Sequence, residues 1–409
     1  MKSLTKIAAV LLGLCLILGL VACSGNGGQQ GGGEQGGEGQ ETTPAEGGEG
    51  QETTPEAVDD AALAAEVDAL IAAIQVQERT AETDAQCAAA KAAWDALTDA
   101  QKELVEEADY FGRDTGDASQ DNPLNQDEIG ENEILVVSFG TSFNQSRTMD
   151  IGSIERAIAE AYPEWSVRRA FTAQIIINHV QARDGEFIDN MDQALERAVA
   201  NGVKNLVVQP THLMHGAEYD ELVAAVEAYK DKFESVKISE PLLGEVGSDA
   251  TVINADKEAV SKAVVEYAFS QYGGREQAES EGYALVLMGH GTSHTANVTY
   301  NQMQAQMAAL GYNNVFIGTV EGEPEDTACD VVIEKVKEAG FKKVILRPLM
   351  VVAGDHANND MADEEDPESW YSMFTASGAF ESVDCDVQGL GRIPEVAQLY
   401  VEHLKAVIE

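Results

Sequence analysis

The hydrophobic pattern from Glu133 to the C-terminus alternates short apolar runs with amphipathic stretches. The apolar runs predict strands at 134–139, 166–171, 206–208, 284–288, 315–318 and 344–346. Apolar residues at helical spacing predict helices at 151–162, 191–201, 218–233 and 331–339. Regular alternation of strand and helix is typical of βαβ units around a mostly parallel sheet that is covered on both faces. We therefore predict an α/β fold for this region.

The same order of strands and turns occurs twice in this region. Gly-Thr-Ser follows the first strand at 140–142 and the fourth strand at 291–293, and a proline ends both the third and the sixth strand. Aligning Gly140 with Gly291 places Phe139 at the position of His290. Aligning Pro210 with Pro348 places Glu218 at the position of His356. We predict two similar parallel-sheet α/β halves, residues 133–275 and 276–409, that arose by internal duplication.

The first 57 residues have a different composition. Residues 1–22 begin with a short charged region and continue as an apolar run, which is typical of a secretory signal peptide. The run ends Leu-Val-Ala-Cys-Ser at 20–24 and resembles the lipobox of bacterial lipoproteins, which implies cleavage before Cys23 and lipidation of that residue. An uncleaved membrane helix is the alternative, although the run is short for a span of ~20 residues. We expect a lipid anchor at the extracytoplasmic face of the cell membrane.

Two further segments lead to the α/β region. Residues 23–57 are rich in Gly, Glu and Gln and repeat one nine-residue sequence at 36–44 and 47–55, so we expect a disordered tether. Residues 58–111 carry apolar positions at helical spacing, and Thr98 to Gln101 form a capping-box sequence. They predict a small helical segment that serves as a spacer or as a docking module. A polar linker, 112–132, follows.

Charge and cysteine content exclude several classes of function. The chain has 409 residues and a formal net charge of −45, from 71 acidic and 26 basic residues, without a run of Lys and Arg. Because binding to phosphates needs clustered positive charge, nucleic acid is not expected as a partner. The 5 cysteines show neither paired nor zinc-type spacing, so a disulfide framework is not expected.

Candidate chemistry lies at the ends of three predicted strands in the second half. His290 stands in a Gly-His-Gly turn, His356 follows the corresponding last strand, and Glu321 follows the strand between them. Ligands bind beyond the carboxyl ends of strands in open α/β sheets, so the three side chains are expected at one edge. Two imidazoles and a carboxylate form a mixed ligand set for Co, Ni, Fe or Zn. The alternative is that they are separate loop residues.

Five motifs in this order resemble a known family. Residues 134–142, 209–212, 288–292, 318–322 and 352–361 resemble the anaerobic-type sirohydrochlorin cobaltochelatases of the class II chelatase group, and the resemblance runs from Glu133 to the C-terminus. It implies a cleft between the two halves and insertion of Co(II), as substrate metal, into sirohydrochlorin during anaerobic cobalamin biosynthesis. It also implies His290, Glu321 and His356 as metal-binding and catalytic residues. No nucleotide is expected, in agreement with the lack of a Gly-x-x-x-x-Gly-Lys-Ser/Thr loop.

Physical chemistry suggests how such a site works. Neutral imidazoles can hold the metal and accept the two protons that leave the macrocycle, because their ordinary pKa of ~6.5 lies near working pH. Glu321 adds negative charge and can relay protons away. Asp355 and either Asn358 or Asp360 are candidates to orient His356. Asp355 could instead cap the following helix.

The tetrapyrrole substrate carries many carboxylates, which need hydrogen-bond donors. Hydroxyls and backbone N–H groups just after strands are suited to this, and His212 is a further candidate contact with the tetrapyrrole. Arg147 and Arg347 could each bind carboxylates or form surface salt bridges. The candidate substrate-binding residues are Thr141, Ser142, His212, Thr292 and Ser293, with Arg147 and Arg347 as further candidates. Of the other histidines, His179 is expected to be structural and His403 to lie at the surface.

A second class of function fits the expected location. An extracytoplasmic lipoprotein could bind haem, another tetrapyrrole or a metal on the same scaffold, since corrin synthesis is expected inside the cell. A chelatase for iron or nickel, or removal of a metal, would use the same residues. The oligomeric state stays open, with a homo-oligomer among the alternatives.

Overall fold

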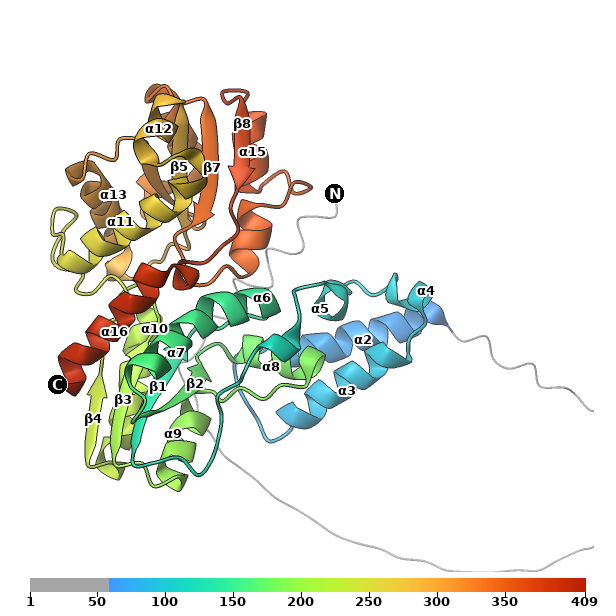
Figure 1. Cartoon of the computed structure of the whole chain (residues 1–409). Helices are drawn as coiled ribbons and strands as arrows, with labels where there is room; N and C mark the ends of the chain where they lie inside the picture. The colour runs from blue at the N-terminus through green and yellow to red at the C-terminus, as the bar shows by residue number, and fades with distance from the viewer. Residues whose placement is uncertain (1–58) are drawn as a thin grey trace, which may run out of the picture. The chain divides into compact units, whose positions relative to one another are not determined.

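The computed structural model describes residues 59–409 (Figure 1). The predicted signal peptide, the lipidation site Cys23 and the predicted tether lie outside the described residues. Residues 59–409 belong to one compact unit.

Two four-stranded parallel sheets form the centre of this unit, one in each predicted half. The first has the strand order β2-β1-β3-β4 and the second the order β6-β5-β7-β8. The strands are β1 (Asn132–Ser138), β2 (Ser166–Phe171), β3 (Asn205–Pro210), β4 (Ser235–Ile238), β5 (Tyr283–Gly289), β6 (Val315–Thr319), β7 (Lys343–Pro348) and β8 (Ser382–Cys385).

The identical strand order confirms the predicted α/β architecture of two similar halves. The register agrees as well, since Val137 pairs with Pro210 in the first sheet as Met288 pairs with Pro348 in the second. The two strands that the hydrophobic pattern did not predict are β4 and β8. Both are four-residue edge strands with half-buried and exposed positions, so they lack the apolar run of a central strand.

Helices cover the sheets and connect their strands (Figure 1). Around the first sheet lie α6 (Asn144–Ser146), the π-helix η2 (Arg147–Ile151), α7 (Gly152–Ala161), α8 (Gln174–Asp184), α9 (Met191–Ala200), α10 (Ala217–Tyr229) and the 3₁₀-helix η3 (Lys230–Lys232). The later elements are α11 (Ala255–Phe269), η4 (Ser270–Tyr272), α12 (Arg275–Ser280), η5 (Thr295–Asn297), α13 (Val298–Ala309), η6 (Glu325–Thr327), α14 (Cys329–Glu338), the π-helix η7 (Ala357–Met361), α15 (Trp370–Ala376), η8 (Leu390–Arg392) and α16 (Pro394–Ile408).

The helix α13 shows why the sequence pattern missed some helices. Its buried face includes Thr299, Gln302 and Gln306 as well as Met303 and Met307. With polar residues on the inner face, the amphipathic pattern that predicts a helix is absent. Gln302 is buried because its amide donates to backbone carbonyls of the 246–249 loop.

Two helices connect the halves. The C-terminal helix α16 packs on α7 and β3 of the first half, and the Tyr400 hydroxyl donates to the carbonyl oxygen of Thr211 at 2.9 Å. Helix α11 precedes residue 275 but packs on α13 of the second half. The first and second halves thus exchange helices, and both helices contribute to one hydrophobic cluster that includes Val264 and Leu404.

The small helical segment is present and forms a hairpin. It consists of α2 (Asp60–Ile74), α3 (Thr83–Ala96), α4 (Asp99–Lys102) and α5 (Asp109–Gly112). Val67, Ile71 and Trp94 are buried within it. The predicted capping box is confirmed, because Thr98 accepts from the backbone N–H of Gln101 and the Gln101 side chain accepts from Thr98 in return.

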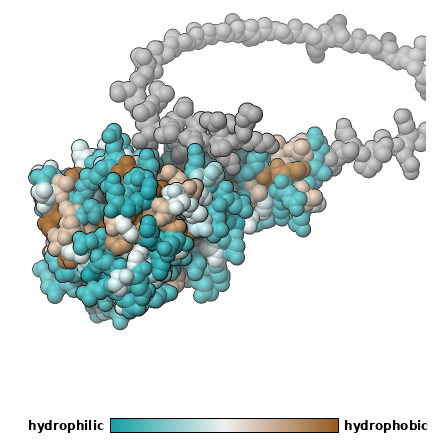
Figure 2. All heavy atoms as spheres, turned by 90° about the horizontal axis from the view of Figure 1, so that it is seen from above, coloured by the Kyte–Doolittle hydropathy of each residue, from teal (hydrophilic) through white to brown (hydrophobic). Residues whose placement is uncertain are grey.

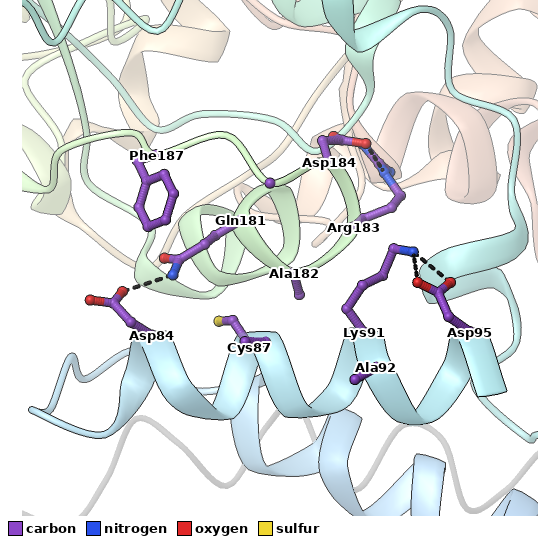
Figure 3. A pocket seen from close by; sticks show the side chains of 12 residues that line it. Asp84, Cys87, Lys91, Ala92, Asp95, Gln181, Ala182, Arg183, Asp184 and Phe187 are labelled. Carbon is purple, nitrogen blue, oxygen red and sulfur yellow. Dashed lines mark hydrogen bonds and ion pairs between the residues drawn. The ribbon is translucent and has the colours of Figure 1, made fainter.

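This segment packs against α8 of the first half (Figures 1 and 3). Asp84 of α3 accepts from the Gln181 amide at 2.7 Å, and the Cys87 thiol faces the carbonyl oxygen of Asn178 at 3.6 Å. The Asn178 amide donates to the carbonyl oxygen of Ile74 at 2.9 Å. A cavity of about 500 Å³ remains beside these contacts, between α3 and the end of α8 (Figure 3). The helical segment is therefore packed on the first half of the α/β region.

The linker after the helical segment is polar but partly buried. It contains the 3₁₀-helix η1 (Ala118–Gln120), and the Asp121 carboxylate accepts from the fully buried guanidinium groups of Arg147 and Arg169, each at 2.6 Å. A buried carboxylate needs such partners, because an unpaired charge in the interior is costly. The linker is therefore fixed on the first half.

The surface agrees with the strongly acidic composition. The face in Figure 2 is mostly hydrophilic, with apolar patches separated by polar side chains. None of the helices between residues 59 and 409 is both long and apolar enough to cross a bilayer. Cys87, Cys329 and Cys385 are free thiols, in agreement with the prediction that these cysteines form no disulfide framework.

Candidate functional site

In the Gly-His-Gly turn at the end of β5, each glycine is required by a different steric constraint. At Gly289 a Cβ atom would lie 2.3 Å from the Tyr300 ring, so the buried tyrosine occupies that space. At Gly291 the backbone has a φ of +93°, and a Cβ would lie 2.8 Å from Cβ of Glu321. Glycine adopts this conformation without steric cost. The turn exposes His290, whose Nδ1 lies 2.8 Å from the carbonyl oxygen of Gly291.

His356 is presented by the loop after β7 and stands just before the π-helix η7. Its Nδ1 contacts the Asp360 carboxylate at 2.8 Å, and Nε2 has no hydrogen-bond partner among the described residues. A carboxylate on one ring nitrogen fixes the tautomer and the orientation of an imidazole that binds metal through the other. Burial acts to lower the pKa of His356, but the hydrogen bond to Asp360 and the charges of Asp360, Asp355 and Glu321 outweigh it and raise that pKa.

The structure brings the two predicted histidines into contact. Their ring centroids are 4.5 Å apart, with an interplanar angle of 82°. Glu321 follows β6 and is held beside them by its backbone, since its N–H donates to the carbonyl oxygen of His290 at 2.9 Å. The Glu321 side chain is exposed, and residues 59–409 contain no group of three or more His, Cys, Asp or Glu side chains arranged to hold a metal ion. The site is thus an open imidazole pair with a carboxylate at its side.

The candidates for orienting His356 have different partners. Asp360 contacts the ring, as described above. Asn358 instead donates to the carbonyl oxygen of Gly354 at 2.7 Å, and Asp355 accepts from the Asn359 amide at 2.6 Å. Asp355 does not cap η7, which has no side-chain cap. Asn358 and Asp355 therefore form hydrogen bonds within the loop, and Asp355 acts on the imidazole only through its charge.

The loop that carries His356 faces the first half of the molecule. A Cβ on Gly354 would lie 3.4 Å from the Thr141 hydroxyl, which follows β1. The buried Asp150 of η2 accepts from the backbone N–H of Ala353 at 3.0 Å and from Arg392 at 2.7 Å. The carboxyl ends of the two sheets are thus held against each other next to the imidazole pair.

The hydroxyl residues predicted to bind substrate fall into two matched pairs. Thr141 accepts from the N–H of Phe143 and Thr292 from the N–H of His294, each at 3.1 Å. Both threonine hydroxyls keep a proton that can be donated to a carboxylate. Thr141 is only 2% exposed and Ser142 is buried, whereas Thr292 is half-buried and Ser293 is exposed. The second pair is the more accessible to a ligand.

His212 lies in an unusual environment. Neither ring nitrogen has a hydrogen-bond partner among the described residues, and both are inaccessible to solvent. Burial lowers its pKa to about 4, against the opposing charge of Glu218. The same glutamate lies near Tyr300, whose pKa is raised to about 12 chiefly by burial and whose hydroxyl accepts from the N–H of Gly291 at 3.1 Å.

Sequence reasoning therefore missed Glu218 and Tyr300 as neighbours of the site. The sequence could have indicated Glu218, because the alignment of the two halves places Glu218 at the position of His356. The sequence contains no comparable indication for Tyr300, whose position depends on the packing of α13 against β6 and on the space that Gly289 leaves for its ring.

With this geometry in view, comparisons with known proteins identify the family. Residues 132–409 match the family model described as cobalt chelatase (CbiK). The chain belongs to the cobalt chelatase (CbiK) family.

Individual relatives are similar over most of their length. The sirohydrochlorin cobaltochelatase of Salmonella typhimurium is 34% identical over 271 residues, which cover 66% of this chain and 94% of that protein. The sirohydrochlorin cobaltochelatase CbiKC of Nitratidesulfovibrio vulgaris is 31% identical over 279 residues, covering 67% and 90%. Among solved structures, SirB from Bacillus subtilis with Fe³⁺ has 15% identity and a TM-score of 0.43, covering 68% of this chain and 95% of that one.

Two expectations for this chelatase are corrected by the structure. Arg147 and Arg347 are completely buried and paired with carboxylates, Arg147 with Asp121 and Arg347 with Asp386. They are neither surface residues nor free to bind a substrate. His403 is also not at the surface: it is buried on the inner face of α16, and its Nδ1 lies 3.2 Å from the carbonyl oxygen of Glu240.

Proposed function

We propose that this chelatase inserts Co²⁺ into sirohydrochlorin without a nucleotide, as the cobaltochelatase step of anaerobic cobalamin biosynthesis. The observation that carries the proposal is the contact between His290 and His356, with Glu321 beside them, at the carboxyl ends of β5, β7 and β6. A chain of the cobalt chelatase family that presents two imidazoles in an open site has the groups that this reaction requires.

The proposed roles follow from the chemistry of insertion. The incoming ion must lose water, and the macrocycle must lose two protons. A neutral imidazole binds a borderline divalent ion and accepts a proton near neutral pH. His290 and His356 are assigned both tasks, and Glu321 attracts the cation and passes protons to solvent. Asp360 holds His356 in the required tautomer.

For the substrate we propose contacts on both sides of the imidazole pair. Thr292 and Ser293 offer accessible hydroxyls to its carboxylates, and Thr141 and Ser142 offer theirs from the first half. His212 lies beside Glu218 and its ring nitrogens lack protein partners. Since both nitrogens are inaccessible to solvent, its proposed contact with the tetrapyrrole requires the surrounding loop to move when the substrate binds.

The decisive experiment incubates the purified protein with sirohydrochlorin and Co²⁺ and follows the absorbance change of metal insertion. We expect a rate well above the uncatalysed control, and loss of that rate in His290→Ala. The matched control is His215→Ala, because the His215 ring pairs with Glu240 at 2.6 Å instead of facing His290. An unchanged rate in His290→Ala would show that the site is misassigned. Replacing Co²⁺ by Fe²⁺ or Ni²⁺ in the same assay identifies the preferred metal.

We also propose that the chain is a lipoprotein anchored through Cys23 at the extracytoplasmic face of the cell membrane. The support is the sequence of residues 1–24, with a charged start, an apolar run and Leu-Val-Ala-Cys-Ser. The test is fractionation of cells that produce the full chain or Cys23→Ser, with the mass of the N-terminal peptide measured. Lipidated Cys23 in the membrane fraction is expected. An intact leader in the wild-type protein would contradict the proposal.

That location favours a second candidate function, capture of haem, another tetrapyrrole or a metal outside the cell. The two functions differ in one measurement, because a binding protein gives tight association without insertion. Tight haem binding together with a Co²⁺ insertion rate equal to the uncatalysed control would replace the first proposal by the second. A size-exclusion profile of the same sample determines whether the chain forms a homo-oligomer.

A further inference from the structure

The segment that precedes the chelatase region reaches the loop of the candidate metal site. Arg113 follows α5 and lies outside residues 132–409, the region that the family model matches. Its Nη1 donates to the side-chain oxygen of Asn359 at 2.9 Å, and Asn359 is three residues beyond His356. The Arg113 guanidinium also lies 5.2 Å from the centre of the Phe143 ring, which belongs to the first half.

Arg113 is held in this position from both sides. Before it, the carbonyl oxygen of Tyr110 contacts Nε2 of His179 in α8 at 2.7 Å, and the two rings stack at 3.8 Å. After it, the carbonyl oxygen of Thr115 accepts from the N–H of Gln145 at 2.8 Å. The appended segment therefore positions the base of this arginine side chain, which lowers the entropic cost of using it to bind a ligand.

A polar cavity of about 460 Å³ opens beside Arg113. Its lining joins three parts of the chain: Arg113 and Gly116 from the linker, Phe143 from the first half, and Asn358 and Arg392 from the second half. Asn358 is two residues beyond His356, so the cavity borders the loop that presents the candidate metal ligand.

The two arginines in this cavity have unused donors. Nine of the eleven arginines in residues 59–409 have a carboxylate oxygen within 4.0 Å, and the exceptions are Arg113 and Arg156. Arg392 donates to Asp150 through Nε, and neither of its Nη atoms donates a hydrogen bond to another described residue. In a chain with 71 acidic residues, an arginine without a carboxylate partner is notable.

Asp114, which also lines the cavity, forms no ion pair with Arg113 or Arg392. Asp114 is exposed, and its Oδ1 accepts from the backbone N–H of Gly116 at 3.0 Å. The cavity thus presents two guanidinium groups and one exposed carboxylate. Guanidinium groups bind carboxylates through parallel hydrogen bonds, which fix both position and orientation.

We propose that Arg113 and Arg392 bind a peripheral carboxylate of the tetrapyrrole in this cavity, so that the appended segment completes the substrate site. The inference rests on the proposed function for the identity of the ligand. It replaces Arg147 and Arg347, which are buried in ion pairs, by two arginines that line a cavity next to His356. It also gives the helical segment a function, since its docking on α8 positions Arg113.

The test compares variants of the full chain in two assays, equilibrium binding of metal-free sirohydrochlorin and steady-state insertion of Co²⁺. We expect Arg113→Ala to raise both the Kd and the KM for the tetrapyrrole by about tenfold or more, as for loss of a hydrogen bond to a charged group. The KM for Co²⁺ should not change, and Arg113→Lys should restore part of the affinity. Arg156→Ala is the matched control, because Arg156 is exposed and donates only to Thr148 and Ser153.

Asn359→Ala separates substrate binding from support of the loop. If Arg113 acted only by holding Asn359, this variant would reproduce the effect of Arg113→Ala, and that result would overturn the proposal. Unchanged tetrapyrrole binding in Arg113→Ala would overturn it as well. If the wild-type protein binds sirohydrochlorin tightly without inserting Co²⁺, the proposed function fails, yet weaker binding by Arg113→Ala still supports this inference. Absence of any tetrapyrrole binding by the wild-type protein contradicts both.

Discussion

The two halves of the chelatase region share a backbone and differ in the side chains that it presents. After β2 the N–H of Ala173 donates to the carbonyl oxygen of Phe139 at 3.2 Å, and after β6 the N–H of Glu321 donates to that of His290 at 2.9 Å. The same turn therefore presents an exposed phenylalanine in the first half and a histidine in the second.

The difference extends to the last central strand of each sheet. The internal register places Glu218 and Leu222 of the first half on His356 and Asp360 of the second. In the second half, Asp360 orients the imidazole of His356. In the first half, the corresponding positions hold the carboxylate Glu218 and the buried Leu222. The scaffold thus requires no histidine at these positions, so the imidazole pair is best explained by function.

The halves also differ in their surroundings. The appended helices pack against α8 of the first half. The second half supplies the imidazole pair and its carboxylate. The first half contributes Thr141 and the surface on which the segment with Arg113 docks. The candidate metal ligands therefore belong to the second half alone, whereas the candidate substrate contacts come from both halves.

The largest effect is expected when His290 of the second half is replaced by phenylalanine, the residue that stands at the corresponding position 139 of the first half. His290→Phe keeps an aromatic side chain at the end of β5 but removes the metal ligand and proton acceptor. Loss of general acid–base catalysis alone lowers rates by about 10²–10⁴-fold, so we expect insertion to fall by at least about 100-fold. The absorbance assay with sirohydrochlorin and Co²⁺ measures this.

The free energy of unfolding of His290→Phe serves as its control. Since Phe139 stands at the same place in the first half, a phenylalanine fits this turn, and we expect stability within about 0.5 kcal/mol of the wild type. Retention of more than a tenth of the wild-type rate would argue against a role for His290 in the reaction.

A second exchange tests the support of His356. Asp360→Leu introduces the residue type of position 222 and removes the carboxylate 2.8 Å from Nδ1 of His356. Loss of such a supporting group typically costs about 10–100-fold in metal affinity or activity. We expect a fall of that size in kcat/KM, with the KM for sirohydrochlorin little changed. Asp366→Asn is the control, because Asp366 is exposed and its carboxylate accepts from the backbone N–H of Glu368 instead of the imidazole.

The sequence predicted where the candidate site residues lie better than it predicted the roles of the residues around them. His290 and His356 could be found because they follow the central strands β5 and β7, and Glu321 because it follows the apolar run of β6. Parallel strands bring their carboxyl ends to one edge of the sheet. The sequence leaves Asn358 and Asp360 as alternatives for orienting His356, and the structure shows that Asp360 contacts the ring. The roles of Arg147 and Arg347 could not be predicted, because burial in an ion pair depends on Asp121 and Asp386, which are remote in sequence. The same holds for Arg113, whose partner Asn359 is 246 residues away.

A third prediction concerns the side of the molecule that carries the appended helices. Burial and the charge of Arg183 lower the pKa of His179 to about 4, against the opposing effects of the Tyr110 carbonyl and Asp184. Because the unfolded chain has the higher pKa, it binds the proton first as the pH falls. The stabilisation is complete above pH ~6.5 and is lost as the pH falls toward about 4, by about 2 kcal/mol between pH 7.5 and 5.

The measurement is urea unfolding of the wild type and His179→Gln at both pH values. The stability difference between them should shrink by about 2 kcal/mol on acidification, since glutamine does not titrate. A difference that is independent of pH would mean that His179 is protonated in the folded protein or does not hold the segment.

The smallest effect is expected from the reverse exchange, Phe139→His. It places an imidazole at the end of β1, where Phe139 is 48% exposed, so the fold should tolerate it. We expect no second metal site, because Ala173 stands in place of Glu321 and Glu218 lies near His212 and Tyr300. Titration calorimetry should give the same number of Co²⁺ ions per chain for the variant and the wild type. An additional equivalent of Co²⁺ would show that the first half needs only one histidine to bind metal, and that the two halves differ in function by a single side chain.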